Sequence, residues 1–171
     1  MKRLYTYFFP VILLVGFTVH QAAAQNEIEI QQSSLRGIGE FYVAINVEGN
    51  DSLAYRDPLS TGQIRQDVIQ ELKEAGLPFI DKEALNPNLR YPYLLVHLNL
   101  MHAGRGIVPF AVNLNFYQPV KLSLNRDKPF YASTWNTGNV GVVSLDRLAV
   151  IPESIHKTVR VFIEDFRKAN Q

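Results

Sequence analysis

Apolar side chains recur at every second position over residues 93–124, and this alternation restricts the fold more than any other feature of the chain. A period of two is typical of β-strands with one buried face. The sequence Ala-Gly-Arg-Gly at 103–106 predicts a hairpin turn, because glycine tolerates positive φ. A second turn at 125–129 leads to a strand that begins near Phe130, so we expect a three-stranded antiparallel meander. The face expected to be buried consists of Leu94, Val96, Leu98, Leu100, Val108, Phe110, Val112, Leu114, Phe116, Val120, Leu122 and Leu124.

Pro119 interrupts the second strand of this meander, because proline cannot donate to a strand ladder. The apolar alternation nevertheless continues beyond it to Leu124. An inserted bulge residue would have reversed the alternation. We therefore expect a bend at Pro119 without a bulge.

Three further segments complete the expected fold. Residues 41–47 alternate like a strand, and residues 60–76 and 152–170 have the period of amphipathic helices. Ser60 and Gln63 fit a capping box at the start of the first helix. The predicted core residues of these segments are Phe41, Val43, Ile45 and Val47 in the strand, Ile64, Val68, Ile69 and Leu72 in the first helix, and Ile155, Val159, Phe162, Ile163 and Phe166 in the second.

The order of elements predicts the fold class. A strand, a helix, a possible short strand at 78–81, the meander and a final helix make an α+β, two-layer sandwich. The sheet should be mainly antiparallel, with both helices on one face. We expect a single domain over residues 35–171, preceded by a polar, flexible leader at 25–34.

The start of the chain predicts export. Lys2 and Arg3 precede an apolar stretch of about sixteen residues, and Ala22 and Ala24 have the small-residue spacing of a signal-peptide cleavage site. We expect residues 1–24 to be a signal peptide cleaved after Ala24, and the protein to lie in the periplasm or outside the cell. The apolar stretch is short for a spanning helix, and no later stretch is apolar enough, so no integral membrane segment is expected after cleavage.

Charge and cysteine content exclude several classes of function. The full chain has 17 Lys and Arg against 16 Asp and Glu, and loss of Lys2 and Arg3 would leave 15 against 16. A near-neutral chain has no electrostatic basis for binding nucleic acid. The chain has no cysteine, so it forms no disulfide and carries no lipid on a thiol.

The predicted meander leaves its second face rich in amides and phenols and poor in charge. Amide and tyrosine side chains suit adaptable hydrogen bonding at a contact surface. A solvated sheet face is the alternative reading. The candidate binding residues on this face are Tyr42, Asn46, Tyr93, His97, Asn99, Asn113, Asn115 and Tyr117.

Trp135, the only tryptophan, is the ninth candidate binding residue. Residues 130–135 do not show which side of their strand is apolar, so the face that Trp135 takes stays open. A core position is the favoured interpretation. A position beside the Asn and Tyr side chains, as a stacking platform, is the alternative.

Catalytic and metal-binding signals are weak. His97 and His102 should point to opposite faces of a regular strand, which argues against a shared metal ion. We expect His156 to lie on the solvent side of its helix, and no carboxylate pair has a spacing typical of acid–base catalysis. No cofactor is expected. An enzyme whose catalytic residues converge from distant parts of the chain stays open as an alternative.

The runs at 35–48, 72–78, 92–100 and 133–143 together resemble a group of small exported bacterial proteins without an assigned function. The order of elements is also similar to that of the lipopolysaccharide-assembly lipoprotein and of ABC-transport auxiliary lipoproteins. This second resemblance concerns the fold. It implies no catalytic residue, and this chain lacks the lipidation cysteine of those families.

From these observations we expect an exported bacterial envelope protein that acts as a non-catalytic binding or accessory module. Its partner should be another envelope protein or a glycan, bound by the polar sheet face or by an exposed sheet edge. A hydrolase-type enzyme and a self-associating structural protein are the alternatives. The sequence leaves the oligomeric state open.

Overall fold

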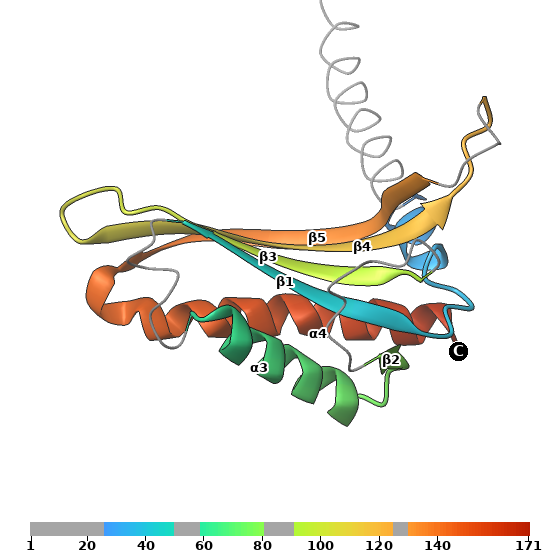
Figure 1. Cartoon of the computed structure of the whole chain (residues 1–171), viewed down its shortest axis with the longest axis horizontal. Helices are drawn as coiled ribbons and strands as arrows, with labels where there is room; N and C mark the ends of the chain where they lie inside the picture. The colour runs from blue at the N-terminus through green and yellow to red at the C-terminus, as the bar shows by residue number, and fades with distance from the viewer. Residues whose placement is uncertain (1–25, 50–58, 81–90, 125–129) are drawn as a thin grey trace, which may run out of the picture.

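A computed structural model of the chain describes residues 26–49, 59–80, 91–124 and 130–171. It has two layers, with a five-stranded sheet on one side and two long helices on the other (Figure 1). The predicted α+β sandwich is therefore confirmed, with both helices on the same face of the sheet.

The sheet is mixed, with strand order β2-β1-β3-β4-β5. Strand β1 (Phe41–Gly49) lies between β2 (Phe79–Ile80) and β3 (Tyr93–Leu100) and runs parallel to both. Strands β3, β4 (Ile107–Val120) and β5 (Phe130–Ser144) form the predicted antiparallel meander. Parallel strands need a crossover connection, and helix α3 (Thr61–Glu74) lies between β1 and β3 in the chain.

The core lies between the sheet and the helices. The predicted inner positions of β3 are buried, and those of β4 are buried from Val108 to Phe116. The prediction fails beyond Phe116, because Leu122 is 47% exposed and Leu124 is 99% exposed. The reason is that this end of β4 and the residues after it project past the helix layer, as Figure 1 shows at the upper right.

A bulge in β5 changes which side chains face the core. Phe116 pairs with Trp135, but its neighbour Tyr117 pairs with Ser133, so Thr134 is an extra residue in β5. Strand β4 itself contains no inserted residue, as predicted. Because one residue is inserted in β5, Tyr131 and Trp135 lie on opposite faces of the sheet although both are odd-numbered.

Trp135 belongs to the core. Its side chain is 1% exposed, and its ring lies 5.1 Å from the ring of Phe162 on helix α4 (Ile151–Ala169). The indole N–H donates to Oδ2 of Asp165 at 3.0 Å. The core interpretation is thus confirmed, and the alternative position beside the Asn and Tyr side chains is wrong because the Thr134 bulge turns this part of β5 inward.

The segment predicted as a flexible leader has regular structure and packs on the domain. Residues 26–33 are helical. The amide of Gln32 donates to Oδ1 of Asp165 at 2.7 Å, and the hydroxyl of Ser34 donates to the carbonyl oxygen of Thr134 at 3.1 Å. Leu35, which follows this segment, is fully buried.

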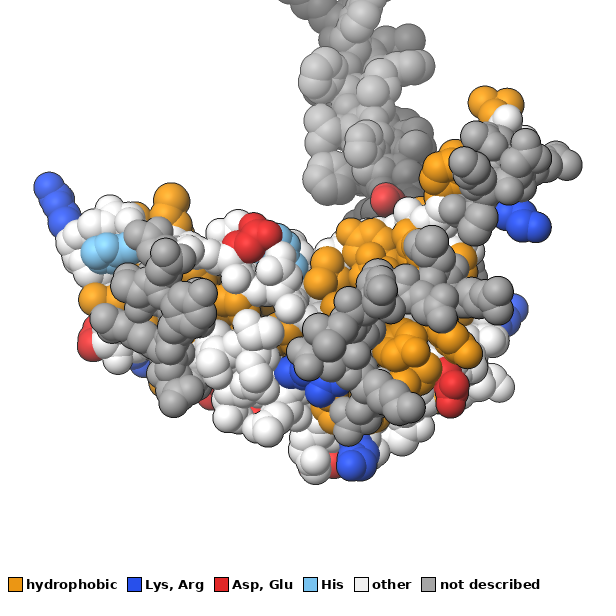
Figure 2. All heavy atoms as spheres, viewed as in Figure 1, with side chains coloured by type: hydrophobic (Ala, Val, Ile, Leu, Met, Phe, Trp, Pro, Cys, Tyr) orange, Lys and Arg blue, Asp and Glu red, His pale blue; other side chains and the backbone are white. Residues whose placement is uncertain are grey.

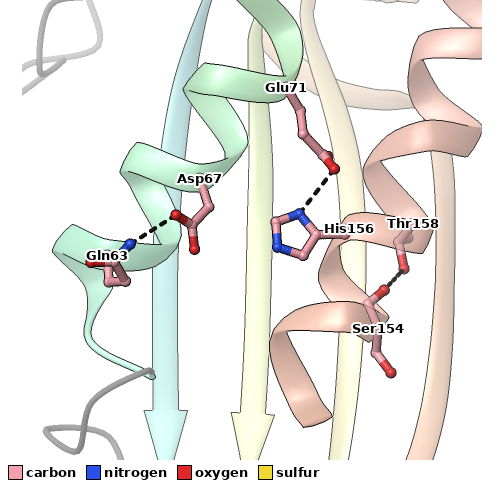
Figure 3. Close-up of polar contacts among 6 residues, drawn as sticks. All are labelled: Gln63, Asp67, Glu71, Ser154, His156 and Thr158. Atoms are coloured by element: carbon pink, nitrogen blue, oxygen red, sulfur yellow. Dashed lines mark hydrogen bonds and ion pairs between the residues drawn. The ribbon is translucent and has the colours of Figure 1, made fainter. Parts of the chain in front are cut away.

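Helix α3 (Thr61–Glu74) starts as predicted, with the backbone N–H of Gln63 donating to the Ser60 hydroxyl. The Gln63 side chain turns instead to Asp67, so the capping box is half formed (Figure 3). Gly76 has φ +70° and ends the helix as expected.

Helix α4 (Ile151–Ala169) follows a short 3₁₀ segment, Leu145–Val150. Its His156 does not point into solvent as predicted. Nδ1 of His156 lies 2.9 Å from Oε1 of Glu71, so the imidazole joins the two helices (Figure 3). This pairing depends on the distance between the helices, which the sequence of either helix alone does not encode.

Candidate functional site

The face of the sheet turned away from α3 and α4, here called the outer face, carries most of the predicted binding residues. Along β3 and β4 these residues alternate with buried core residues, and in β1 Asn46 lies between the partly buried Ile45 and Val47. Strand pairing places them in cross-strand rows. The predicted residues on the outer face are Tyr42, Asn46, Tyr93, His97, Asn99, Asn113, Asn115 and Tyr117, whereas Trp135 lies on the opposite side.

A tyrosine cluster occupies one end of this face and consists of Tyr42, Tyr91, Tyr93, Tyr117 and Tyr131. The rings of Tyr93 and Tyr117 are stacked, with centroids 4.9 Å apart and an angle of 14° between the ring planes. Tyr131 leans on Tyr93 at 5.6 Å, and Tyr42 meets Tyr91 edge to face at 5.7 Å. In Figure 2 hydrophobic side chains, which include Tyr there, gather toward the end of the molecule that holds the C terminus.

The stacking determines what the tyrosine cluster can do. Because Tyr93 and Tyr117 stack on each other, one face of each ring is covered, and ring edges and hydroxyl groups are their main remaining contact groups. Burial and the neighbouring phenols of Tyr117 and Tyr131 raise the pKa of Tyr93, and burial raises the pKa of Tyr131. Tyr93 and Tyr131 therefore keep their phenol protons at neutral pH. The phenols of the cluster can donate and accept hydrogen bonds with little loss of side-chain entropy.

The middle of the outer face carries a cluster of asparagine side chains and His97, here called the amide cluster. Within it, Glu48 holds Asn46, whose Nδ2 donates to the Glu48 carboxylate at 2.8 Å. The other carboxylate oxygen lies 3.4 Å from Nε2 of His97. That contact is an ion pair when the imidazole is protonated but lacks hydrogen-bond geometry, and Nε2 makes no hydrogen bond to any described residue. The members of the amide cluster are Asn46, His97, Asn99, Asn113, Asn115 and Asn136.

Gly138 leaves a hollow beside the amide cluster. It pairs with Asn113 across β4 and β5, and a Cβ atom at this position would lie 2.8 Å from the Asn113 side-chain oxygen and 2.7 Å from the carbonyl oxygen of Val112. Without that atom a hollow of 330 Å³ opens, bordered by Asn113, Asn115 and Asn136. Hydrogen-bonding amides form most of its border, and Val140 adds an apolar side chain.

The other end of the outer face is apolar. We define the apolar end as Met101, Ile107, Pro109, Ala111, Val140 and Val142. Val140 is 84% exposed and Val142 is 67% exposed. Met101 and Ile107 are also more than two-fifths exposed. A shallow hollow of 560 Å³ is bordered by His97 and by all members of the apolar end except Ile107.

Charge is nearly absent from the outer face. Glu48 is the only carboxylate, and there is no Lys or Arg, among the described outward-facing positions of β1, β3, β4 and β5. The exposed side of α4, in contrast, carries Glu153, Lys157, Arg160, Glu164 and Lys168. The two layers of one small domain thus present surfaces of different character.

Several members of the outer face were missed by sequence reasoning. Tyr131 and Asn136 belong to it because of the Thr134 bulge, which exchanges the faces of β5. Tyr91 precedes β3 and joins through contacts with Tyr42 and Tyr131. The apolar end could have been suspected from the two valines of the sequence Val-Gly-Val at 140–142, but the register that places them beside β4 is not visible in the sequence.

Among the described residues, no group of three or more His, Asp or Glu side chains is placed to hold a metal ion. No described helix combines the length and apolar character needed to cross a membrane. Comparison of the sequence with protein-family models and with curated proteins finds no match.

Proposed function

We propose that this protein is an exported, non-catalytic binding module of the bacterial envelope, and that its outer face is the binding surface. The observation that supports the proposal best is the single carboxylate among the described outward-facing positions of four neighbouring strands. A face in contact only with water normally carries charges of both signs. The opposite layer of this domain has them, so the lack of charge is specific to the outer face.

The partner that suits this face is an uncharged surface of another envelope protein. Depletion of charge and enrichment of tyrosine are typical of the centres of protein interfaces. A glycan that stacks on an aromatic ring is less well suited, because Tyr93 and Tyr117 already stack on each other. Asn113 and Asn115 can still donate and accept hydrogen bonds beside the tyrosine cluster.

Partner capture tests this proposal. The double variant Asn113→Ala with Tyr117→Ala removes one amide and one stacked phenol from the outer face. Lys157→Ala with Arg160→Ala on exposed α4 is the matched control. We expect the first variant to lose capture of partner proteins from an envelope extract while its melting temperature stays within about 3 °C of the wild type, and the control to keep capture. Equal capture by all three proteins would contradict the proposal.

Export is a separate part of the proposal, because residues 1–24 lie outside the described residues. It is supported by the charged start, the apolar stretch and the Ala22 and Ala24 spacing. Mass spectrometry of the protein from the periplasmic or culture fraction should show a chain that begins at Gln25. A cytoplasmic chain that retains Met1 would contradict this part.

A hydrolase-type enzyme is the second candidate, and the place of His97 beside the larger hollow favours it. An imidazole can act as a general base, and both hollows adjoin Asn113, a potential hydrogen-bond donor to a substrate. Turnover of envelope esters or glycans that is lost in His97→Ala would support the enzyme. The absence of such turnover, together with partner capture, would support the binding module.

A further inference from the structure

Strand β5 forms one edge of the sheet and has an unusual composition for an edge. It pairs with β4 on one side, and its 15 residues include no charged residue and no proline. Exposed edges present unpaired backbone groups, and proteins usually protect them with charges, prolines, bulges or covering segments. The way in which this edge is protected therefore indicates how it is used.

The first half of the β5 edge is covered by the chain's own N-terminal segment. The hydroxyl of Ser34 donates to the carbonyl oxygen of Thr134, and the backbone N–H of Asn136 donates to the side chain of Gln31. The bulge at Thr134 lies in the same half. Residues 26–34 and the bulge thus protect the edge as far as Asn136.

The second half of the edge is open in the described structure. Backbone groups of alternate residues point to opposite sides of a strand, so those of Gly138, Val140 and Val142 point outward like the N–H of Asn136. No backbone hydrogen bond from these three residues to a described segment outside the sheet is present. Val140 and Val142 are also the two most exposed members of the apolar end.

We propose that a second copy of this chain pairs with the open half of β5, antiparallel and about a two-fold axis at Val140. The two sheets would then form one continuous sheet of ten strands. Pairing of this kind satisfies the outward backbone groups of both copies at once, because the outward-facing residues lie at equal distances on either side of Val140. Isologous contacts of this type are the commonest in homodimers.

The side chains around Val140 are complementary to themselves. In this register Val140 faces Val140 of the second copy, and each Val142 faces a Gly138, where no side chain competes for space. No charge within this stretch calls for an opposite charge on a different kind of partner. The pairing would also join the two apolar ends into one surface and cover the flanks of the exposed valines.

Helix α4 supports the same choice of partner. Asn139 of β5 donates to Ser154 and Thr158, which identifies the side of α4 that lies next to the edge. Val161 follows Thr158 by three residues on that side and is 42% exposed. A second copy with its helices on the same face of the continuous sheet would bring apolar surface to this flank as well.

The test introduces charges of opposite sign at Val140, where the proposed two-fold axis passes. Sedimentation of the exported protein should show a dimer for the wild type. Val140→Lys and Val140→Glu should each weaken the dimer at least about tenfold, because like charges face each other across the axis. A mixture of the two variants should restore the dimer. Val142→Lys mixed with Val142→Glu is the control and should show no such rescue, because these positions do not face each other.

Three results would overturn the inference. They are a wild type that remains monomeric up to about 1 mM, near the weak limit of specific association, a dimer that the Val140 variants leave unchanged, and equal rescue by both mixtures. Circular dichroism of each variant checks that its fold is retained, which we expect because Val140 is exposed. The outcome does not depend on the outer-face partner, whose capture is measured separately with the Asn113 and Tyr117 variants.

Discussion

Replacement of Trp135 by phenylalanine tests the internal side of the sheet. The change removes the indole N–H that donates to Asp165 at 3.0 Å and part of a ring that is 1% exposed. A hydrogen bond to a charged group contributes about 1.5 to 3 kcal/mol. The lower end applies here, because Asp165 is partly exposed and keeps its bond from Gln32. Lost packing against Phe162 adds about 1.5 kcal/mol. The free energy of unfolding should therefore fall by about 3 kcal/mol.

Urea unfolding followed by far-ultraviolet circular dichroism measures this loss, since the variant has no tryptophan fluorescence. With a slope of about 2 kcal/mol/M, the midpoint should fall by about 1.5 M. Tyr42→Phe on the outer face is the matched control and should change the free energy of unfolding by less than about 0.5 kcal/mol. A loss below about 1 kcal/mol for Trp135→Phe would refute the reasoning, as would wild-type tryptophan emission typical of an indole in water.

Three further predictions concern single contacts. Gly138→Ala should lower the free energy of unfolding in urea by about 1 to 3 kcal/mol, because the new Cβ would meet the Val112 carbonyl oxygen. Gly62→Ala, on an open helix surface, is the control and should be neutral or stabilising. Equal effects of the two changes would contradict the close approach at Gly138. Because the pKa of Tyr93 is raised in the folded state, the free energy of unfolding should fall as the pH rises above about 10. Tyr93→Phe should make this fall less steep. An equally steep fall in the variant would contradict a role of Tyr93 in the pH dependence. His156→Ala should lower the free energy of unfolding by about 1 kcal/mol through loss of its bond to Glu71, and a change near zero would show that this bond is not formed in solution.

The fold was predictable where a local pattern has a strong physical cause. The period-two alternation of β3 and the first ten residues of β4 assigned their buried faces correctly, because a one-residue error would expose a whole row of apolar side chains. The place of β1 between β2 and β3 was not predictable, because it depends on contacts between distant parts of the chain. The helix at 26–33 was missed because Gln31 and Gln32 attach it through amides rather than through an apolar stripe.

The candidate site was predictable only in part, and the bulge at Thr134 explains much of the difference. Neither side of residues 130–135 looked apolar because the bulge changes the phase of the strand within that segment. The same change moved Trp135 into the core and brought Tyr131 to the outer face. The apolar end combines residues from separate strands, so it became visible only once the register of β4 against β5 was known.

The central claim is that the outer face contacts a partner while the helix layer faces water. Photo-crosslinking in the producing cell tests it most directly. A photoreactive phenylalanine analogue at position 113 reports on the outer face, and the same analogue at position 157 reports on exposed α4. We expect a discrete cross-linked product from position 113 and none from position 157. No product from position 113, or equal products from both positions, would contradict the claim.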